Sequence, residues 1–513
     1  MAPTPPVAHF IFASSPFWGH SRPQLYLAFS LLEMFPSLHI TFLVAPVFAP
    51  NIPKETAFFG PSEDVRSRIR VEPLGQSGLK QSDWEPQYLT FLEDLKPWLL
   101  SLPPESSQHD SGDGFSKRPT LAVVDILLAG WTDAMRQLAD DPSHNFSPIR
   151  SLAYGCGPAA WTLWRMTRAP SVKRFKALKE DPNNVSVPVE DLLRQAFMYT
   201  DGSVMEIEGV GKTYDYELVP QAEAVPFDGH WLNFVFEGGA KIRNFSGLVL
   251  STPPDIEPGL QRRIAEELNG ICLHVGPQFP PSFWAREATA IVHHESIEFL
   301  DDCEKRFGAN SVVYISFGSL YSPSQRPDLL ETLIESLLST EPPLPFLLAT
   351  ATIGDVISDR VRKLVSESGG KGLITGFAPQ LHVLQHPATG WFLTHGGAGS
   401  ITESIINRVP MVLWPCMTDQ PIASMNLTLN WKLAFELIQV RTGPGAGKPT
   451  YRGIQHENSI EAVKREMAET WKLMRGPEGR GVRERVNQMG ENFEQSWKNG
   501  LARENMRQFE QFF

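Results

Sequence analysis

Cysteine is scarce in this sequence, with four residues in a chain of 513. They are Cys156, Cys272, Cys303 and Cys416, and no two of them form a C-x-x-C pair. Scattered cysteines of this kind argue against a disulfide framework and against a zinc ribbon. We therefore expect four reduced, buried thiols and no resident metal.

Basic charge and long apolar runs are also scarce. Asp and Glu outnumber Lys and Arg by 58 to 46, which gives a net charge of −12. A broad basic face for nucleic acid or an anionic membrane is therefore not expected. No apolar run is long enough to cross a bilayer, and residues 1–8 lack the basic start of a secretory signal. We expect a cytoplasmic monomer with no transmembrane segment and no nucleic-acid partner.

The composition that remains is typical of a globular enzyme, with 42% hydrophobic and 20% charged residues. The length suggests two domains. Short apolar strands alternate with amphipathic helices in both halves, which predicts α/β domains with doubly wound parallel sheets. Strands are expected at 9–15, 39–45, 69–74, 121–126, 149–154 and 247–251, and again at 311–317, 345–349, 373–377, 390–394, 410–414 and 436–440.

A glycine-rich turn in the second half is the strongest local signal. The expected strand 390–394 leads into His395-Gly396-Gly397-Ala398-Gly399, and a helix is expected from about Ser400. Backbone N–H groups at such a helix start bind a diphosphate well, because small residues allow close approach. A second interpretation stays open, since Ser400-Ile401-Thr402-Glu403 also fits a capping box.

The surrounding stretch, residues 377–420, resembles the C-terminal signature of the family 1 UDP-glycosyltransferases over all 44 positions (420 − 377 + 1). The plant form reads W-A-P-Q…H-P…G-x-F-L-T-H-C-G-W-N-S…E…G-V-P-M…W-P…D-Q. This chain has F-A-P-Q, H-P, G-W-F-L-T-H-G-G-A-G-S, V-P-M, W-P and D-Q at the matching places. Its H-G-G-A-G resembles microbial and sterol-type members. The resemblance implies a GT-B fold, in which two Rossmann-like domains face a cleft.

The resemblance also implies which residues bind the UDP-sugar. Phe377 would stack on the uracil and Gln380 would lie near the ribose, whose hydroxyls Glu403 would bind. The turn and Ser319 would hold the diphosphate, and Asp419 with Gln420 would hold the sugar. The full expected set is Gly19, Ser319, Phe377, Ala378, Gln380, His395, Gly397, Ala398, Gly399, Ser400, Glu403, Asp419 and Gln420.

His20 is the expected general base. It follows the first strand in P-F-W-G-H-S-R-P-Q-L, which resembles the G-H-x-x-P of the family. Histidine suits the role because its pKa lies near neutrality. Asp125 ends an apolar run and would orient the imidazole, with a helix cap near Gly130 as the alternative. The acceptor residues are expected to be Phe17, Trp18, Trp131 and Trp161.

The domains are expected at 1–252 for the acceptor and 282–490 for the donor, with a linker at 253–281 and a returning helix at 491–513. The implied activity is inverting O-glycosyl transfer from UDP-glucose or UDP-xylose to a lipophilic terpenoid, sterol or phenol of secondary metabolism. Gly155 stands where many plant members place a Thr, which leaves the sugar open. No D-x-D motif occurs, so neither a metal nor a cofactor beyond the UDP-sugar co-substrate is expected. A UDP-sugar 2-epimerase and a non-catalytic UDP-sugar-binding subunit are the alternatives.

Overall fold

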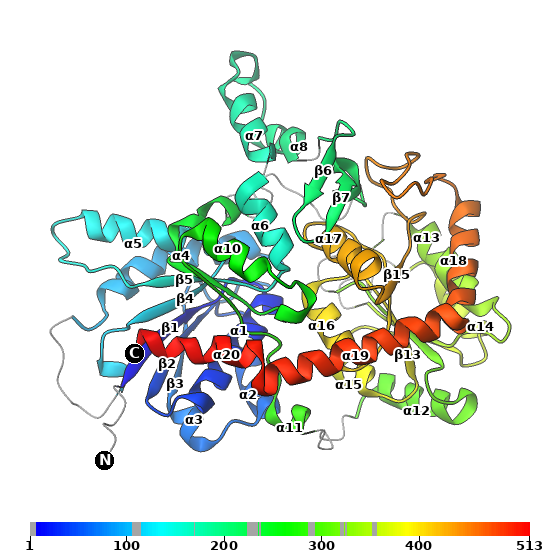
Figure 1. Ribbon diagram of the computed structural model, residues 1–513, viewed down its shortest axis with the longest axis horizontal. Coiled ribbons are helices and arrows are strands. Elements are labelled where there is room, and N and C mark those ends of the chain that lie inside the picture. Colours follow the sequence, from blue (N-terminus) through cyan, green and yellow to red (C-terminus); the bar gives the residue numbers. More distant parts are fainter. Residues whose placement is uncertain are drawn as a thin grey trace. The chain divides into compact units, whose positions relative to one another are not determined.

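The computed structural model describes residues 7–104, 114–168, 170–197, 199–222, 234, 238–285, 293–318, 323, 326–350 and 357–513. They form two compact units, and each is interrupted in sequence (Figure 1). The first unit comprises residues 1–177, 230–289 and 495–513. The second comprises residues 178–229 and 290–494. None of the helices in the described part of the chain is long and apolar enough to cross a bilayer.

The first unit is built on a parallel sheet in the order β3-β2-β1-β4-β5-β8-β9. Its central strands are apolar and buried on both faces, as a sheet between two helical layers requires. Its strands are β1 (Ala8–Ala13), β2 (Leu38–Val44), β3 (Ile69–Pro73), β4 (Leu121–Asp125), β5 (Ser151–Gly155), β8 (Gly247–Leu250) and β9 (Ile271–His274). Its helices are α1 (Trp18–Met34), α2 (Ile52–Phe59), α3 (Glu63–Ser67), α4 (Trp84–Leu100), α5 (Gly130–Asp140), α6 (Ala159–Arg168), α10 (Leu260–Leu268), α11 (Pro281–Trp284) and α20 (Leu501–Arg507).

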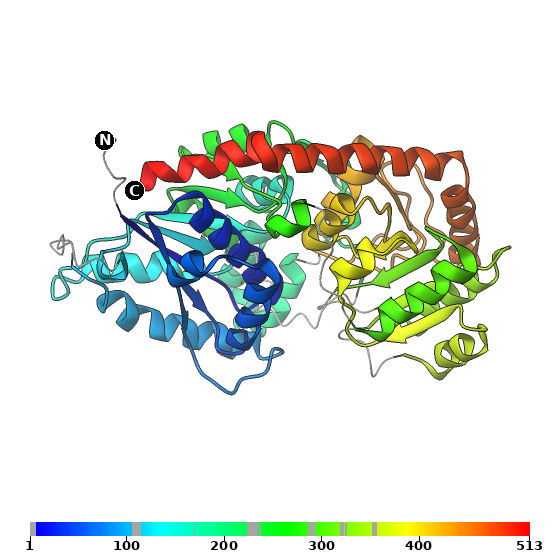
Figure 2. The same ribbon diagram turned by 90° about the horizontal axis from the view of Figure 1, so that it is seen from below.

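One face of this sheet packs against α1, α2 and the end of the chain. Alternate residues of β1, Phe10 and Phe12, point into that layer, where Phe509 and Phe512 of the C-terminal tail are also buried. The ring of Phe513 lies edge-on to Phe10, with 5.7 Å between the ring centroids. Figure 2 shows the end of the chain beside β1. The tail is thus part of the first unit's core.

The second unit contains a parallel sheet in the order β12-β11-β10-β13-β14-β15. Its strands are β10 (Val312–Ser316), β11 (Phe346–Ala349), β12 (Gly372–Thr375), β13 (Thr389–Thr394), β14 (Met411–Leu413) and β15 (Ala434–Glu436). Its helices are α8 (Val189–Phe197), α12 (Glu295–Phe307), α13 (Pro327–Leu338), α14 (Asp359–Glu367), α15 (Gln380–Gln385), α16 (Ala398–Ile406), α17 (Gln420–Met425) and α18 (Ile460–Arg475), while α7 (Pro170–Glu180) and α19 (Pro477–Asn499) belong partly to each unit.

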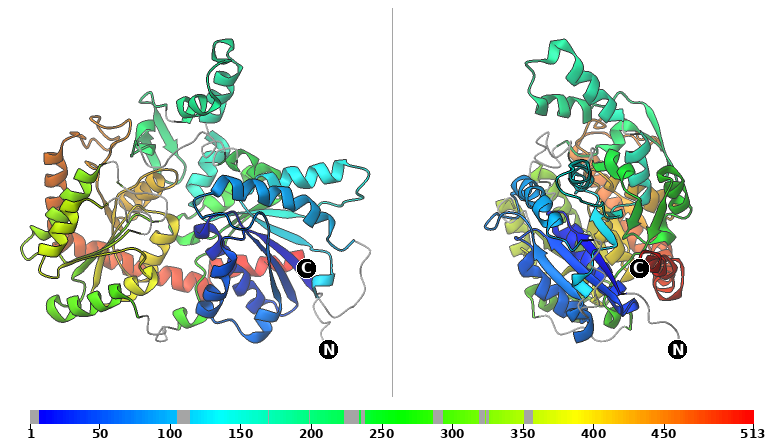
Figure 3. Two further views of the ribbon diagram at one scale, coloured as in Figure 1. Left: turned by 180° about the vertical axis from the view of Figure 1, so that it is seen from behind. Right: turned by 90° about the vertical axis from the view of Figure 1, so that its left-hand side faces the viewer.

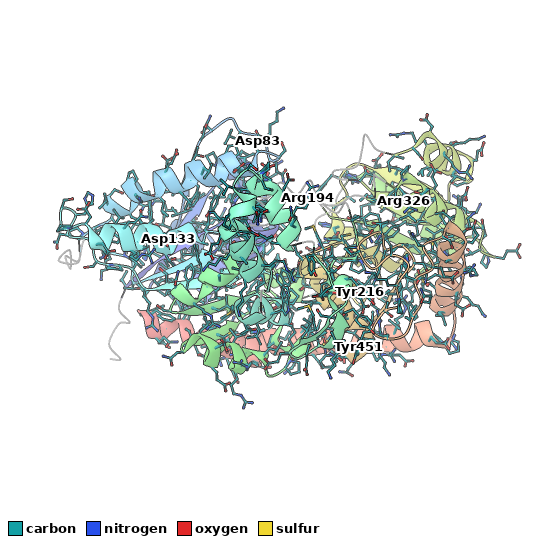
Figure 4. The ribbon with its side chains drawn as sticks, turned by 90° about the horizontal axis from the view of Figure 1, so that it is seen from above. Asp83, Asp133, Arg194, Tyr216, Arg326 and Tyr451 are labelled. Carbon is teal, nitrogen blue, oxygen red and sulfur yellow. The ribbon has the colours of Figure 1, made fainter. Side chains whose placement is uncertain are left out.

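Residues 178–229 belong to the second unit, although the sequence was expected to keep them in the first domain. Their two antiparallel strands are β6 (Val204–Ile207) and β7 (Gly211–Tyr214), shown from behind in Figure 3. A buried ion pair of 3.3 Å joins Glu217 to Arg441, and the Tyr216 hydroxyl donates to the Pro449 carbonyl at 2.6 Å. Figure 4 labels Tyr216 and Tyr451 on this insertion and on the loop beneath it. Residues 178–229 are polar and show little periodicity, so the sequence gave no sign of these buried polar contacts.

Residues 253–281, which were expected to form a linker, are part of the first unit in the structure. They contain α10 and the edge strand β9, and both belong to the first unit. Their paired prolines suggested a connection without a core. The short apolar run Ile271-Cys272-Leu273-His274 nevertheless pairs with β8 and buries its side chains.

Candidate active site

Three chemically active side chains meet in the first unit at the carboxyl ends of neighbouring parallel strands. His20 lies in the first turn of α1, which follows β1. Asp125 is the last residue of β4, and Cys156 comes directly after β5. The chain connections reverse direction between β1 and β4, and in open α/β sheets ligands bind at such a switch point.

His20 and Asp125 form the expected pair. The Nδ1 atom of His20 lies 2.8 Å from Oδ2 of Asp125, and the other carboxylate oxygen accepts the Leu127 N–H at 2.8 Å. The aspartate is fully buried, whereas 28% of the His20 side chain is exposed. The first residue of α5 is Gly130 and its N-cap is Ala129, so Asp125 does not cap that helix. The carboxylate is thus fixed on one side and orients the imidazole on the other.

The electrostatic surroundings of His20 increase the affinity of its ring for a proton. Burial lowers the pKa of the imidazole, but the neighbouring Asp125 and Cys156 outweigh this effect and raise the pKa well above its usual value. Asp125 and Cys156 therefore stabilise the imidazolium that forms when the ring accepts a proton. This is the property that a general base needs when it removes a proton from a weakly acidic hydroxyl.

Of the four expected acceptor residues, Phe17 is the one with a described ring contact to His20. Phe17 lies beside the imidazole, with 6.1 Å between ring centroids. Trp18 packs on Phe48, Trp131 is fully buried with its indole N–H on Ser151, and Trp161 stacks on Trp164. Trp131 and Trp161 are buried, whereas Trp18 is half-buried against the core of the first unit.

Two of the rings that accompany Phe17, those of Trp84 and Tyr88, were not expected from the sequence as acceptor residues. Trp84 and Phe234 lie 6.5 and 6.2 Å from Phe17, and Tyr88 lies edge-on to Phe234 at 4.7 Å. Phe17, Trp84, Tyr88 and Phe234 are called the aromatic cluster below. Trp84 and Tyr88 share one face of α4 because they are four residues apart, and Figure 4 marks Asp83, which precedes that helix. That i, i+4 spacing is the signal that could have found them.

In the second unit, the glycine turn is shaped around His395. Gly318 and Gly396 have φ angles of +76° and +81°. A Cβ atom at Gly318 or Gly397 would lie 2.7 or 2.6 Å from the His395 ring, so both positions require glycine. Burial lowers the pKa of His395 to about 4, which leaves the imidazole neutral at pH 7.

The helix after the turn, α16, starts two residues earlier than expected. Gly397 is its N-cap, and Ala398, Gly399 and Ser400 form its first turn. Ser400 is therefore inside the helix, and the capping-box interpretation is wrong. Glu403 instead accepts a hydrogen bond of 2.8 Å from Nε2 of Gln380, which begins α15. The free N–H groups of this helix start lie next to His395, as an anion site requires.

Four of the remaining expected donor residues, Phe377, Ala378, Asp419 and Gln420, are described in the second unit. The Phe377 side chain is 72% exposed, and Ala378 beside it is buried. Gln420 accepts the backbone N–H groups of Cys416 and Met417 at 2.9 and 3.1 Å, and Asp419 accepts the Thr418 hydroxyl at 2.8 Å. Gly19 is in the first unit, in the first turn of α1. Ser319 lies outside the described residues.

Several known proteins are similar to this chain in sequence. Residues 294–442 match the family model "UDP-glucoronosyl and UDP-glucosyl transferase". The UDP-glycosyltransferase eriJ of Hericium erinaceus is 27% identical over 480 residues, which cover 88% of each chain. The 7-deoxyloganetic acid glucosyltransferase of Catharanthus roseus is 34% identical over 157 residues, which cover 30% of each chain.

Solved structures share the fold over nearly the whole chain. A UGT transferase from Siraitia grosvenorii, crystallised with UDP, superposes with a TM-score of 0.69 at 19% identity, covering 98% of this chain and 99% of that one. The expected α/β architecture of two doubly wound units is thus confirmed as that of the GT-B glycosyltransferases. The family model and the fungal relative thus support a UDP-dependent glycosyltransferase, similar in sequence to those of family 1.

Proposed function

We propose that this enzyme transfers a sugar from UDP-glucose or UDP-xylose to a hydroxyl group of a lipophilic, ring-bearing small molecule, with inversion at the anomeric carbon. The observation that carries the proposal is the 2.8 Å contact between His20 and Asp125 at the sheet's switch point. The acceptor class follows from the aromatic cluster beside it, since three of its rings are only half-buried.

The first unit activates the acceptor. A neutral His20 removes the hydroxyl proton as the oxygen attacks the anomeric carbon, and the bond from that carbon to the UDP oxygen breaks. Asp125 stabilises the imidazolium that results, and its second oxygen stays bound to the Leu127 N–H. A single displacement from an α-linked donor gives a β-linked product, and no covalent sugar–enzyme intermediate forms.

The second unit binds the donor. In this proposal Phe377 stacks on uracil, Glu403 binds the ribose hydroxyls, and the N-terminus of α16 with neutral His395 binds the diphosphate. Hydrogen-bond donors in these positions stabilise the negative charge that develops on departing UDP. Asp419 and Gln420 would bind the sugar, and these groups together make a resident metal unnecessary for the step.

The identity of the sugar rests on Gly155, the last residue of β5. A Cβ atom there would lie 3.0 Å from Leu250, so a threonine would need Leu250 to move. Gly155 has no side-chain hydroxyl that could bind the 6-hydroxyl of a hexose. The UDP derivative of a pentose, which lacks that hydroxyl, therefore remains a suitable donor. The glucosyltransferase name of the Catharanthus relative favours glucose instead.

A donor and acceptor panel tests the proposal. The enzyme is incubated with UDP-glucose, UDP-xylose, UDP-glucuronate or UDP-GlcNAc and with terpenoid, sterol and phenolic alcohols, while UDP release and product mass are followed. We expect UDP release that depends on the acceptor, and a β-linked product by NMR. An altered UDP-sugar without acceptor product would support the 2-epimerase alternative. UDP binding without turnover would support a non-catalytic subunit.

A further inference from the structure

We propose that His20, Asp125 and Cys156 form a binding site for Zn²⁺ and that zinc bound there blocks glycosyl transfer. A ring nitrogen of His20, a carboxylate oxygen of Asp125 and Sγ of Cys156 all lie within 4.8 Å of one another. These three residues come from three segments at one edge of the sheet, where β1, β4 and β5 are neighbours. The arrangement is therefore a property of the fold rather than of one flexible loop.

The donor set suits zinc in particular. Imidazole nitrogen, thiolate sulfur and carboxylate oxygen are the three ligand types that bind Zn²⁺ in proteins, at about 2.0–2.3 Å. Ligand atoms around a tetrahedral zinc ion lie about 3.4–3.7 Å apart, which follows from those bond lengths. Small side-chain rotations would bring the three atoms to that spacing. Ca²⁺ and Mg²⁺ prefer sites built from oxygen alone, so they should bind poorly.

Charge and access also favour the site. A thiolate and a carboxylate together neutralise the ion, which removes most of the cost of a charge in a buried position. When zinc binds, the S–H bond of Cys156 breaks and a Zn–S bond forms. A protonated His20 also loses the proton on the nitrogen that binds the ion, and both protons go to solvent. Asp125 is fully buried but His20 is 28% exposed, so an ion can reach the site from water. The Leu127 N–H already orients the aspartate, as outer hydrogen bonds do in zinc sites.

The inhibition follows from the use of His20. A zinc ion on the imidazole or on Asp125 breaks their 2.8 Å contact and occupies the groups that would accept the proton. This part of the inference depends on the proposed function, whereas zinc binding itself does not. The two parts are therefore tested by separate measurements.

Metal binding is measured first, with Co²⁺ as a spectroscopic substitute for Zn²⁺ in the full-length enzyme. We expect one equivalent of Co²⁺ to give a thiolate-to-cobalt charge-transfer absorption that Zn²⁺ then abolishes. Cys156→Ser should remove that absorption, because a hydroxyl is a poor zinc ligand. Cys303→Ser is the matched control, since Cys303 lies in α12 of the second unit, and it should keep the absorption. A wild-type enzyme without the absorption, or a Cys156→Ser enzyme that retains it, would overturn the site.

Inhibition is measured next, with buffered Zn²⁺ in the transfer assay. We expect Zn²⁺ but not Mg²⁺ to inhibit, EDTA to restore activity, and Cys156→Ser to need at least about tenfold more Zn²⁺ for half inhibition. Cys303→Ser should match the wild type, which also controls for zinc bound to the UDP-sugar. A Cys156-dependent cobalt spectrum together with unimpaired transfer at saturating Zn²⁺ would overturn the inhibitory role and would also argue against His20 as the base.

Discussion

The Nδ1 atom of His20 lies 2.8 Å from Asp125 Oδ2, so the carboxylate holds one nitrogen of the ring. The proposed function assigns the other nitrogen to the acceptor hydroxyl. Asp125 is fully buried, and its other oxygen accepts a backbone N–H. Its position is therefore fixed by the end of β4 rather than by the substrate. The geometry makes separate predictions for the two residues.

We predict that His20→Ala lowers kcat for glycosyl transfer by about 10²–10⁴-fold, because general-base catalysis is lost. UDP affinity should stay within about twofold, since the residues proposed to bind UDP lie in the second unit. Steady-state kinetics and calorimetric UDP titration measure the two quantities. Turnover close to the wild-type value would rule out His20 as the base.

Asp125→Asn should lower kcat by about 10²–10⁴-fold while the folded structure is retained, because an amide cannot stabilise the imidazolium. Asp133→Asn is the control. Asp133, labelled in Figure 4, lies in α5 and accepts a hydrogen bond of 2.9 Å from Lys241. Replacing it should leave kcat at the wild-type value. An Asp125→Asn enzyme with normal kcat would show that the contact only supports the fold.

Phe377→Ala should weaken UDP binding by about 1–3 kcal/mol, because the exposed ring is proposed to stack on the uracil. Phe307→Ala provides the comparison, since Phe307 is also an exposed phenylalanine of the second unit and lies under Arg306. Calorimetric titration with UDP compares both variants with the wild type. Equal affinities for all three proteins would remove the stacking role.

Trp84→Ala should raise the acceptor KM, because the indole belongs to the aromatic cluster. The expected loss in kcat/KM corresponds to about 0.5–1.5 kcal/mol for each lost ring contact. Leu89→Ala on the exposed side of the same helix should leave both constants unchanged. A normal acceptor KM in Trp84→Ala would place the acceptor elsewhere in the first unit.

His274→Leu should reduce the acid sensitivity of the first unit. His274 is buried in β9, and within the described residues neither ring nitrogen has a partner. Burial lowers the pKa of this imidazole from 6.5 to about 4. The unfolded chain therefore binds the proton more readily. The stability that His274 contributes is complete above pH 6.5 and is lost as the pH falls towards 4.

The shift corresponds to about 3 kcal/mol of stability over that range. Thermal unfolding at pH 4, 5, 6 and 7 should show a flatter pH dependence in His274→Leu than in the wild type. His144→Gln changes a partly exposed histidine of the same unit and should leave the profile unchanged. Parallel profiles for the wild type and His274→Leu would show that His274 is not the titrating group.

The architecture was largely predictable because strand periodicity is local. Buried runs such as Leu121-Ala122-Val123-Val124 carry the signal in adjacent residues, and the structure has β4 there. The edge strand β9 was missed because flanking prolines and glycines resembled a linker. The place of residues 178–229 was missed because pairs such as Glu217 and Arg441 are 224 positions apart.

The site was predictable only where a family motif marked it. His20 and Asp125 are 105 positions apart, and a resemblance rather than periodicity brought them together. The aromatic cluster has no such motif. Large aromatic side chains occur both in cores and in binding sites, so Trp131 and Trp84 could not be distinguished before their burial was known.

Residues 178–229 belong to the second unit although the chain reaches them before it completes the first unit, and this limits how two such enzymes can be recombined. Glycosyltransferase halves exchanged at a single junction near residue 282 would separate Glu217 from Arg441, and a buried guanidinium would lose one of its two carboxylate partners. Recombinant hybrids should therefore move residues 178–229 together with 290–494. Transferring the donor preference of one enzyme to another would then require two separate gene segments, because the second unit is built from two stretches of the chain.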